Sequence, residues 1–391
     1  MRRRHFGRRF RPVRRKDDVQ VTTMMNIQQA TRQYEAWLAS HLRVVPRDLV
    51  TKHELMAQDA FSFLRATFYR WMQLFPERCP ALARAPAVLA VGDLHVENYG
   101  TWRDAEGRMV WGINDFDEAF PLPYTLDLVR LATSAWLAIK EGDLAIVPTK
   151  ACASILEGYT QGLGNGGEPY VLSEKHSWLR EAVTSGQRDP TRFWEKLTAL
   201  PSARPVPAKL RLLLNQAMPE QGLAFRVAHR RAGLGSLGRD RFTAIADWRG
   251  GKIAREAKAL LPSACAWAGG LSNHEIYYPR MLANIVRAPD PFLMVQGGWV
   301  LRRLSPYCSR IELSQLPRRQ ESDQLLRAMG RELANVHLGT RRAVPAVQHD
   351  LAHRKAKWLG QAAELMVAAI LKDWREWQKG ARSSPTNRAR G

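Results

Sequence analysis

Residues 92–100 read Gly-Asp-Leu-His-Val-Glu-Asn-Tyr-Gly, and they directly follow a short apolar run at 87–91. A second apolar run, at 109–113, is followed by Asn-Asp-Phe-Asp-Glu at 114–118. Apolar runs of this length that end in Gly, Asp or Asn are typical of buried strands that lead into loops. We therefore expect two adjacent strand ends that bring Asp, His, Asn and further carboxylates to one place.

Asp93 and Asn98 have the spacing of the Asp and Asn in a kinase catalytic loop, where the Asp accepts the proton of the acceptor hydroxyl and the Asn holds Mg²⁺. Asp115 then stands where the next metal-binding Asp of a kinase is expected, with Asp117 close behind it. Carboxylates packed this closely repel one another unless a cation lies among them, and Mg²⁺ prefers such hard oxygen ligands. The alternative is structural, because Asp and Asn also stabilise turns that bind nothing.

A glycine-rich motif, Gly-Leu-Gly-Ser-Leu-Gly, occupies residues 233–238. A dinucleotide site would need a helix directly after it, but the run at 242–248 is typical of a strand. We therefore expect a strand–loop–strand hairpin, the kinase arrangement in which backbone amides cover the nucleotide phosphates. A glycine-rich turn without a ligand is the alternative.

The rest of the apolar pattern predicts an α+β protein and not alternating βαβ units. Helical periodicity is found at 61–75, 128–139 and 358–377. Strand-like runs are found at 225–229, 241–247 and 252–257, and a hairpin is expected at 292–304. The expected units are a basic disordered tail (1–22), a helix-rich lobe with the acidic motifs (23–220), a strand-rich nucleotide-binding lobe (221–315), C-terminal helices that pack on the helical lobe (316–378) and a second basic tail (379–391).

The formal net charge is +22, of which residues 1–16 carry +9 and the last 13 residues carry +4. The concentration of charge in the tails predicts solvated segments, or weak binding to a polyanion. No apolar run is long enough to span a membrane, and no apolar segment follows the first arginines as an export signal requires. Four isolated cysteines without metal spacing favour buried free thiols in the cytoplasm.

The motifs resemble those of aminoglycoside phosphotransferase-like kinases and, more closely, those of the bacterial DUF2252 family, an uncharacterised group with kinase-like motifs. The resemblance rests on Gly-Asp-Leu-His-x-x-Asn (92–98), Ile-Asn-Asp-Phe-Asp-Glu-Ala (113–119) and Leu-Asp-Leu-x-Arg-Leu-Ala (126–132). Further matches, which extend it over roughly residues 50–340, lie at 61–65, 232–238, 301–305 and 333–337. It implies a bilobal protein-kinase-like fold that binds ATP and Mg²⁺.

Carried over position by position, the resemblance implies three groups of site residues. The catalytic group is Asp93 as the base, His95 and Asn98. The metal ligands are Asn98, Asp115 and Asp117. The nucleotide-binding group is Gly233, Gly235, Ser236, Gly238, Arg255 and Glu256. Asp127 and Arg65 would support the catalytic loop. His95 has two roles open to it: it positions Asp93 or the phosphates, or it satisfies a carbonyl of its own loop.

Two departures from the kinase pattern stand out. The family has Lys-Glu-Ala after the glycine loop, where this chain has Arg255-Glu256-Ala257. The guanidinium group of Arg is planar and binds through several N–H groups, whereas the ammonium group of Lys is a compact point charge. Lys252 and Lys258 are alternative clamps, although Lys258 would face away from the side that Arg255 faces. The glycine loop also follows the catalytic Asp, so the lobes are expected in permuted order. In that arrangement the run 299–304 is a candidate hinge strand at the adenine.

The leading hypothesis is an ATP- and Mg²⁺-dependent phosphotransferase that acts on an unidentified hydroxyl-bearing acceptor. Because of Arg255, the alternative is a catalytically weak or inactive nucleotide-binding regulator, or an AMP transferase. A metallophosphoesterase also begins with Gly-Asp-x-His, but its further His and Asn motifs are missing from the sequence. A nucleic-acid-binding protein would fit the charge, yet no recognised nucleic-acid motif accompanies it.

Overall fold

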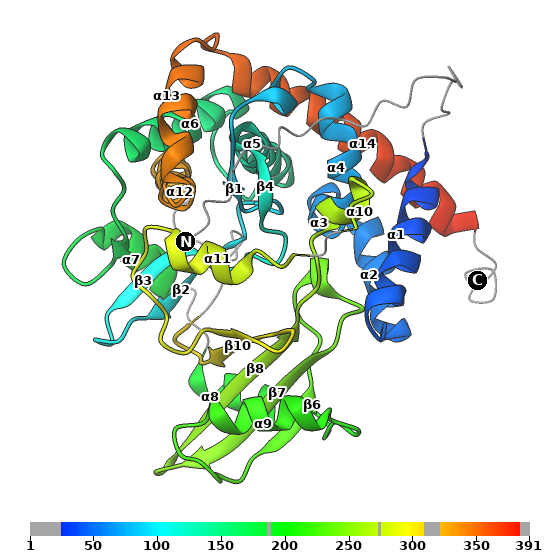
Figure 1. The fold of residues 1–391 in the computed structure, drawn as a ribbon, viewed down its shortest axis with the longest axis vertical. Helices are drawn as coiled ribbons and strands as arrows, with labels where there is room; N and C mark the ends of the chain where they lie inside the picture. Colours follow the sequence, from blue (N-terminus) through cyan, green and yellow to red (C-terminus); the bar gives the residue numbers. More distant parts are fainter. Residues whose placement is uncertain (1–24, 186–188, 273–274, 309–320, 384–391) are drawn as a thin grey trace, which may run out of the picture.

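The computed structural model describes residues 25–185, 189–272, 275–308 and 321–383 of the chain. It is a mixed α+β structure, as predicted, with 52% helix and 16% strand. Helices make up most of the molecule, and the largest sheet lies at one end, at the bottom of Figure 1. In the part of the chain that is described, no helix is long and apolar enough to cross a membrane.

The helical part is built around α5 (Tyr124–Glu141), which is buried along most of its length. Two further long helices, α6 (Pro148–Gly164) and α12 (Ser322–His337), cross at glycines. A Cβ at Gly158 or Gly330 would overlap a backbone oxygen of the opposite helix, so only glycine permits this close approach. The remaining helices of this part are α1 (Ile27–His41), α2 (Pro46–Gln58), α3 (Ala60–Ala66), α4 (Phe68–Arg78), α7 (Ser177–Ser185), α10 (Ala264–Ala268), α11 (Tyr278–Asn284), α13 (Val344–Ala352) and α14 (Trp358–Ser383).

The helix expected over 61–75 is divided into α3 and α4 at Thr67, whose backbone leaves the helical region (φ −124°, ψ 40°). The Thr67 hydroxyl donates to the Phe63 carbonyl at 2.7 Å, which ends the first helix with its polar groups paired. The apolar spacing continues across the break because both helices pack on the same core.

Two small sheets carry the acidic motifs. The first pairs β1 (Ala87–Ala90) with β4 (Phe120–Pro123), and the second has the order β2-β3-β5. Its strands are β2 (Tyr99–Arg103), β3 (Met109–Ile113) and β5 (Tyr170–Val171). We had expected the two apolar runs of the sequence, which form β1 and β3, to be neighbours. They lie instead in two different sheets. β1 pairs with the apolar segment Phe-Pro-Leu-Pro of β4, and β3 pairs with β2, whose sequence lacks a clear apolar run.

The largest sheet is antiparallel, with the order β6-β7-β8-β10-β9. Its strands are β6 (Arg226–His229), β7 (Arg241–Trp248), β8 (Gly251–Ala259), β9 (Met294–Gln296) and β10 (Trp299–Leu304). The β9–β10 hairpin confirms the predicted hairpin at its glycine pair. In register, Thr243, Glu256 and Arg302 lie side by side, as do Arg241 and Lys258 on the next rung but one. These side chains share the face that we call the inner face, which is turned toward the helical part.

The outer face of this sheet is covered by α9 (Ala208–Gln216), whereas α8 (Pro190–Thr198) packs on the inner face, at the end of the sheet that lies away from Lys258. Leucines of α9 pack on Phe242 and Leu301, and Phe193 of α8 packs on Ile245. These helices were expected in the helix-rich lobe, so the proposed boundary at residue 220 is corrected: the unit built on the sheet begins before α8. Conversely, α10 and α11, inserted between β8 and β9, pack on the helical core.

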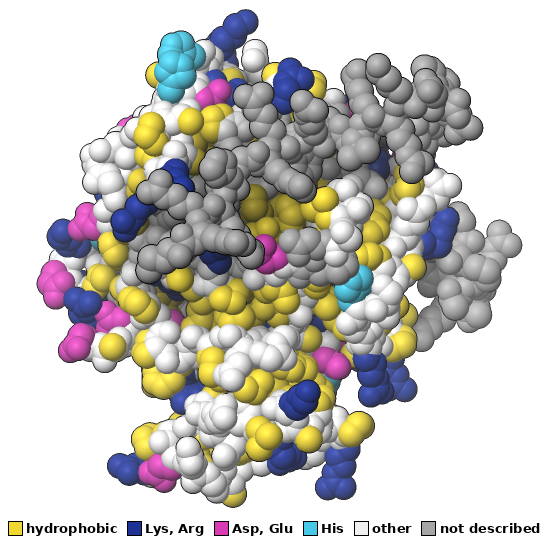
Figure 2. Space-filling view, in the orientation of Figure 1, with side chains coloured by type: hydrophobic (Ala, Val, Ile, Leu, Met, Phe, Trp, Pro, Cys, Tyr) yellow, Lys and Arg dark blue, Asp and Glu magenta, His cyan; other side chains and the backbone are white. Residues whose placement is uncertain are grey.

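Two of the expected segments fall on the ends of the chain. The tail 1–22 and residues 384–391 lie outside the described residues, and α14 continues through Ser383, beyond the predicted start of the second tail. On the face shown in Figure 2, Lys and Arg side chains are scattered among uncharged ones and do not gather in one patch. Polyanion binding by the tails therefore stays a prediction. The cysteines are free, with Cys79, Cys152 and Cys265 buried and Cys308 half-buried.

Candidate functional site

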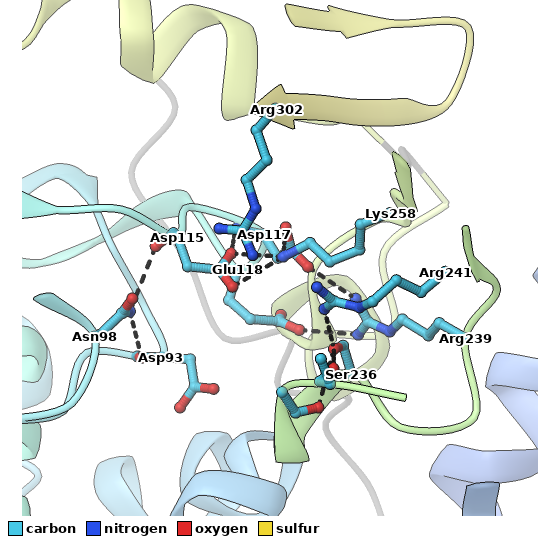
Figure 3. Close-up of polar contacts among 12 residues, drawn as sticks. Asp93, Asn98, Asp115, Asp117, Glu118, Ser236, Arg239, Arg241, Lys258 and Arg302 are labelled. Atoms are coloured by element: carbon cyan, nitrogen blue, oxygen red, sulfur yellow. Dashed lines mark hydrogen bonds and ion pairs between the residues drawn. The ribbon is translucent and has the colours of Figure 1, made fainter. Parts of the chain in front are cut away.

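A cavity of about 240 Å³ lies where the inner face of the five-stranded sheet meets the helical part. Three loops and the sheet line it: the Asp93 loop (91–98), the Asp115 loop (114–119) and the glycine loop (230–240). Figure 3 shows side chains from all of them pointing toward one another. The polar residues that line the cavity include Arg65, Asp93, His95, Glu97, Asn98, Asp115, Asp117, Glu118, Arg230, Ser236, Arg239, Arg241, Arg287, Asp290 and Arg302.

The first turn of α5 fixes the start of the Asp93 loop. The Asp127 carboxylate accepts the backbone N–H groups of Val91 at 2.7 Å and Gly92 at 2.9 Å. Gly92 has φ +84°, and a Cβ there would overlap the Glu118 carbonyl oxygen, so the turn requires glycine. The oxygen that accepts the Val91 N–H, Asp127 Oδ2, also contacts His337 Nε2 at 3.0 Å. Asp127 therefore lies where the resemblance implies, at the base of the loop.

Asp93 is paired with Arg130, a fully buried residue of α5 that the sequence did not single out. Arg130 Nε and Nη2 both donate to Asp93 Oδ1, and Nη2 also donates to the Leu64 carbonyl at 2.9 Å. The guanidinium lies over the rings of Phe68 and Trp71. Burial raises the pKa of Asp93, and the Arg130 charge opposes that rise. The sequence contained one indication of this role, because Arg130 belongs to the Leu-Asp-Leu-x-Arg motif.

The far end of the Asp93 loop is held by Arg65, whose guanidinium lies 2.6 Å from the Glu97 carboxylate. His95 is buried, and its Nδ1 accepts the Glu97 backbone N–H at 3.2 Å. The ring thus bonds within its own loop, but to a backbone N–H and not to the carbonyl that the sequence analysis named. His95 also borders the cavity, so the ring lies within reach of a ligand as well.

Asn98 joins the two acidic loops. Its side-chain amide donates to the Asp93 carbonyl at 3.1 Å and to the Asp115 carbonyl at 3.4 Å. The backbone carbonyl of Asn98 accepts the Asn114 backbone N–H at 3.2 Å. The structure thus brings Asp93, Asn98 and Asp115 together although their strands lie in different sheets (Figure 3).

Lys258, on the inner face of β8, lies between the two carboxylates of the Asp115 loop. Its Nζ is 2.9 and 2.8 Å from the two carboxylate oxygens of Asp115 and 2.8 Å from Asp117 Oδ1. Burial acts to raise the pKa of Asp115, but the Lys258 ammonium outweighs it and holds that pKa well below its usual range. Burial and the neighbouring Asp115 charge raise the pKa of Asp117 to about 6.

Arg239 and Glu118 form a second ion pair beside this one, and the sequence reasoning missed its importance. Arg239 Nη2 donates to Glu118 at 3.2 Å, and its Nη1 lies 3.5 Å from Asp117. Glu118 also accepts the Ser263 hydroxyl at 2.8 Å and the Ala264 N–H at 2.7 Å. Arg239 directly follows the glycine motif, so this pair fixes the end of the glycine loop to the Asp115 loop.

The glycine loop connects β6 to β7, which pair antiparallel, so the strand–loop–strand arrangement is as predicted. Gly233 and Gly238 have φ of +75° and +96°, which side chains rarely adopt. A Cβ at Gly235 would lie 3.0 Å from the Arg65 carbonyl oxygen and 3.6 Å from Asp93 Oδ2. The loop therefore covers the Asp93 carboxylate directly. Ser236 Oγ accepts a hydrogen bond from Arg241 at 2.7 Å.

The expected place of Arg255 is corrected by the structure. Its side chain projects from the outer face of β8, where its Nε donates to the Ala217 carbonyl at 2.8 Å and its guanidinium covers the Phe292 ring. Because side chains alternate along a strand, Glu256 and Lys258 lie on the inner face instead. On β8, the basic residue that meets the acidic loops is therefore Lys258, which the alternation of the strand could have identified.

Glu256 is fully buried, and it accepts hydrogen bonds from three arginines on the inner face. Arg241 Nη1 donates at 2.7 Å and Arg302 Nε at 2.9 Å, while Arg230 Nη1 bonds the other carboxylate oxygen. Burial acts to raise the pKa of Glu256, but these three charges hold it well below its usual range. Glu256 was expected to bind nucleotide, and the structure shows it holding the arginines that line the cavity.

The described residues contain no cluster of three or more His, Cys, Asp and Glu side chains that could hold a metal ion. Asn98 and Asp115 nevertheless supply an amide and a carboxylate at one place, and Mg²⁺ in nucleotide sites commonly takes only one or two protein ligands besides phosphate and water. The donor chemistry therefore fits Mg²⁺.

Comparison with known proteins supports the family resemblance over part of the chain. Residues 43–191 match the model of a family described as an uncharacterized protein conserved in bacteria, DUF2252. This range contains both acidic loops and Asp127, but not the glycine loop or Lys258. No curated protein and no solved structure matches the chain.

Proposed function

We propose that this protein is an ATP- and Mg²⁺-dependent phosphotransferase with a kinase-like, permuted arrangement of its two lobes. The observation that carries the proposal is the convergence of the Asp93 loop, the Asp115 loop and the glycine loop on one cavity, with Lys258 bonded to the Asp115 loop. Protein kinases use the same four parts: a catalytic Asp, a metal-binding Asp, a glycine-rich hairpin and a Lys on the strand that follows that hairpin. Here the hairpin β6–β7 is followed by β8, which carries Lys258.

Asp93 is the proposed base for the acceptor hydroxyl. Arg130 occupies its Oδ1, and Oδ2 is directed toward the glycine loop. Burial raises the pKa of this carboxylate, which brings a carboxylate base closer to the operating pH. Because the glycine loop lies directly on Asp93, a phosphoryl group can enter between them only if the loop moves outward.

Asn98 and Asp115 are the residues that would hold Mg²⁺, with Asp117 beside them. The metal would neutralise charge on the transferring phosphoryl group. Asp115 suits this role because its carboxylate stays ionised, its pKa being held below the usual range by Lys258 against the opposing effect of burial. Lys258 would bind the nucleotide phosphates as the kinase Lys does, while Asp127, Arg130 and Arg65 keep the Asp93 loop in place.

The inactive-regulator hypothesis depended on Arg in place of the expected Lys. That argument for an inactive protein is weakened by Lys258, whose ammonium lies 2.8 Å from the Asp115 carboxylate. Only turnover separates an enzyme from a regulator. The acceptor, and the choice between phosphoryl and AMP transfer, are open to the same experiment.

The test is isothermal titration of the full chain with ATP, with and without Mg²⁺, followed by incubation with γ- or α-labelled ATP and a small-molecule extract. We expect Mg²⁺-dependent binding and transfer of the γ label. Transfer of the α label would establish an AMP transferase, and binding without any transfer would establish a regulator. No binding of ATP in either condition would reject the proposal.

A further inference from the structure

The inner face of the five-stranded sheet concentrates three arginines on one carboxylate. Arg230, Arg241 and Arg302 come from the end of β6, from β7 and from β10, and all three bond to Glu256. Their side chains are 19%, 5% and 31% exposed, respectively. All three line the cavity, and Figure 3 shows Arg241 and Arg302 directed toward the acidic loops.

Charge at this cluster is unbalanced. In the part of the chain that is described, Glu256 is the carboxylate within ion-pair distance of these three arginines, so three positive charges share one negative charge. Burial of Arg241 and partial burial of Arg230 and Arg302 are unfavourable without counter-charge, because burial removes water that would solvate the guanidinium groups. The cluster therefore has a surplus of positive charge that faces the cavity and suits an anion.

Geometry favours an extended anion over a compact one. The guanidinium groups surround Glu256 from three strands, and Arg241 also donates to Ser236 of the glycine loop at 2.7 Å. Lys258 lies two residues along β8 from Glu256 on the same face, beside Asp115. Arg287 lines the same cavity, and among the described residues its Nε has no hydrogen-bond partner. The donors thus form a row from the glycine loop across the sheet.

We propose that Arg230, Arg241 and Arg302, held in place by Glu256, form a polyphosphate subsite that binds two or more adjacent phosphates without a metal. Planar guanidinium groups bind phosphate oxygens in pairs of hydrogen bonds, and Glu256 fixes their orientation in advance. Assigning these phosphates to the donor nucleotide rests on the proposed function. The binding of a polyphosphate chain rests on the arginines alone.

The experiment compares inorganic tripolyphosphate, orthophosphate, ATP and AMP by isothermal titration in the presence of a chelator. The test variant is Arg230→Gln with Arg302→Gln, which leaves Arg241 and Glu256 paired one to one and so removes the surplus without an unpaired buried charge. The matched control is Arg249→Gln with Lys252→Gln, which removes the same charge from the β7–β8 turn of the same sheet, where both side chains are exposed by 39% or more.

We expect the wild-type chain to bind tripolyphosphate at least about tenfold more tightly than orthophosphate, and ATP more tightly than AMP. The test variant should lose at least about tenfold in tripolyphosphate affinity, and the control should stay within about twofold. Arg230→Lys with Arg302→Lys keeps the charge and should recover part of the affinity, which separates charge from misfolding. Circular dichroism checks the fold of every variant.

Three results would overturn the subsite: no tripolyphosphate binding by the wild-type chain, equal affinity for orthophosphate, or unchanged affinity in the test variant. The same experiments test the proposed function independently of the subsite. Tripolyphosphate binding that depends on the arginines, together with no transfer from labelled ATP, would reject the phosphotransferase and keep the subsite. Transfer of the γ label by the test variant at the wild-type rate and ATP affinity would reject the subsite and keep the phosphotransferase.

Discussion

The two ends of the cavity differ in how their charges are balanced. At the acidic end, three carboxylates, Asp115, Asp117 and Glu118, share two bases, Lys258 and Arg239. At the arginine end, three guanidinium groups share the Glu256 carboxylate. A slight negative excess at the acidic end therefore lies close to a positive excess at the arginine end. The two ends are joined by Lys258 and Glu256, which are two residues apart on the inner face of β8.

The distribution of charge in the cavity is therefore polarised. Its acidic end suits a cation and its arginine end suits an anion, which is the charge pattern of a magnesium–polyphosphate ligand. A site in which every charge was paired one to one would have much less electrostatic attraction for such a ligand. Each of the following variants alters one end and leaves the other in place.

The largest effect is expected from Asp93→Asn at the acidic end. Loss of a positioned base should lower the rate of transfer by about 10²- to 10⁴-fold, while the affinity for Mg-ATP changes little because Asp93 is not proposed to contact phosphate. Asparagine retains an oxygen that accepts from Arg130, so the loop keeps its anchor. Single-turnover kinetics with γ-labelled ATP and titration with Mg-ATP measure the two quantities.

The pH profile provides the control for this variant. A base must be ionised, so wild-type activity should rise with pH through the pKa of Asp93, and burial places that pKa above the ordinary value for Asp, about 3.9. Asp93→Asn should remove this limb from its residual activity. Equal and modest losses of rate and of affinity, with an unchanged profile, would show that Asp93 has only a structural role.

A smaller effect is expected where the two ends meet, on β8. Lys258→Met should weaken Mg-ATP binding by about tenfold or more, because it removes the ammonium between Asp115 and Asp117. Arg255→Met changes a base three residues away on the outer face, where its Nε bonds Ala217, and should leave the affinity within about twofold. Isothermal titration of both variants decides it. A larger loss of Mg-ATP affinity in Arg255→Met than in Lys258→Met would show that Arg255, and not Lys258, binds the phosphates.

Local spacing was sufficient to predict part of the site. Asp93, Asn98 and Asp115 come together, and the glycine loop is a hairpin, because each depends on a few neighbouring residues whose turn chemistry is visible in sequence. Asp127 was found through its motif. The helix and strand runs were likewise located, although Thr67 divides one helix where the apolar period continues unbroken.

The partners of these residues could not be predicted, because they depend on register and packing. Arg255 was chosen since it aligns with a family triplet, yet strand alternation gives the inner face to Lys258. Arg130 reaches Asp93 across 37 residues, and no local rule selects that pair. The unit boundary at residue 220 failed for the same reason: the assembled sheet shows that α9 packs on its outer face and α8 on its inner face.

The smallest effect is expected from Glu332→Gln, behind the arginine end. Glu332 on α12 accepts the Ile113 N–H at 3.2 Å and the Asn335 side-chain amide at 2.8 Å, and burial raises its pKa to about 7, against the opposing effects of Asn335 and Arg287. If Glu332 is largely protonated below this pH, it gives Arg287 no counter-charge there. The charge of Arg287, which lines the same cavity, then adds to the positive excess of the three arginines around Glu256.

The folded-state pKa of Glu332 is above the ordinary value for Glu, about 4.3, so its stabilising contribution is complete below that value and is lost as pH rises through about 7. Wild-type stability should therefore fall between pH 5 and pH 8 by on the order of 1 kcal/mol more than that of Glu332→Gln, which resembles the protonated acid at every pH. Urea unfolding at both pH values measures this, with the exposed Glu54→Gln as the control that should follow the wild type. If Glu332→Gln also follows the wild type, Glu332 is ionised throughout this range and balances Arg287, so the positive excess is confined to the three arginines around Glu256.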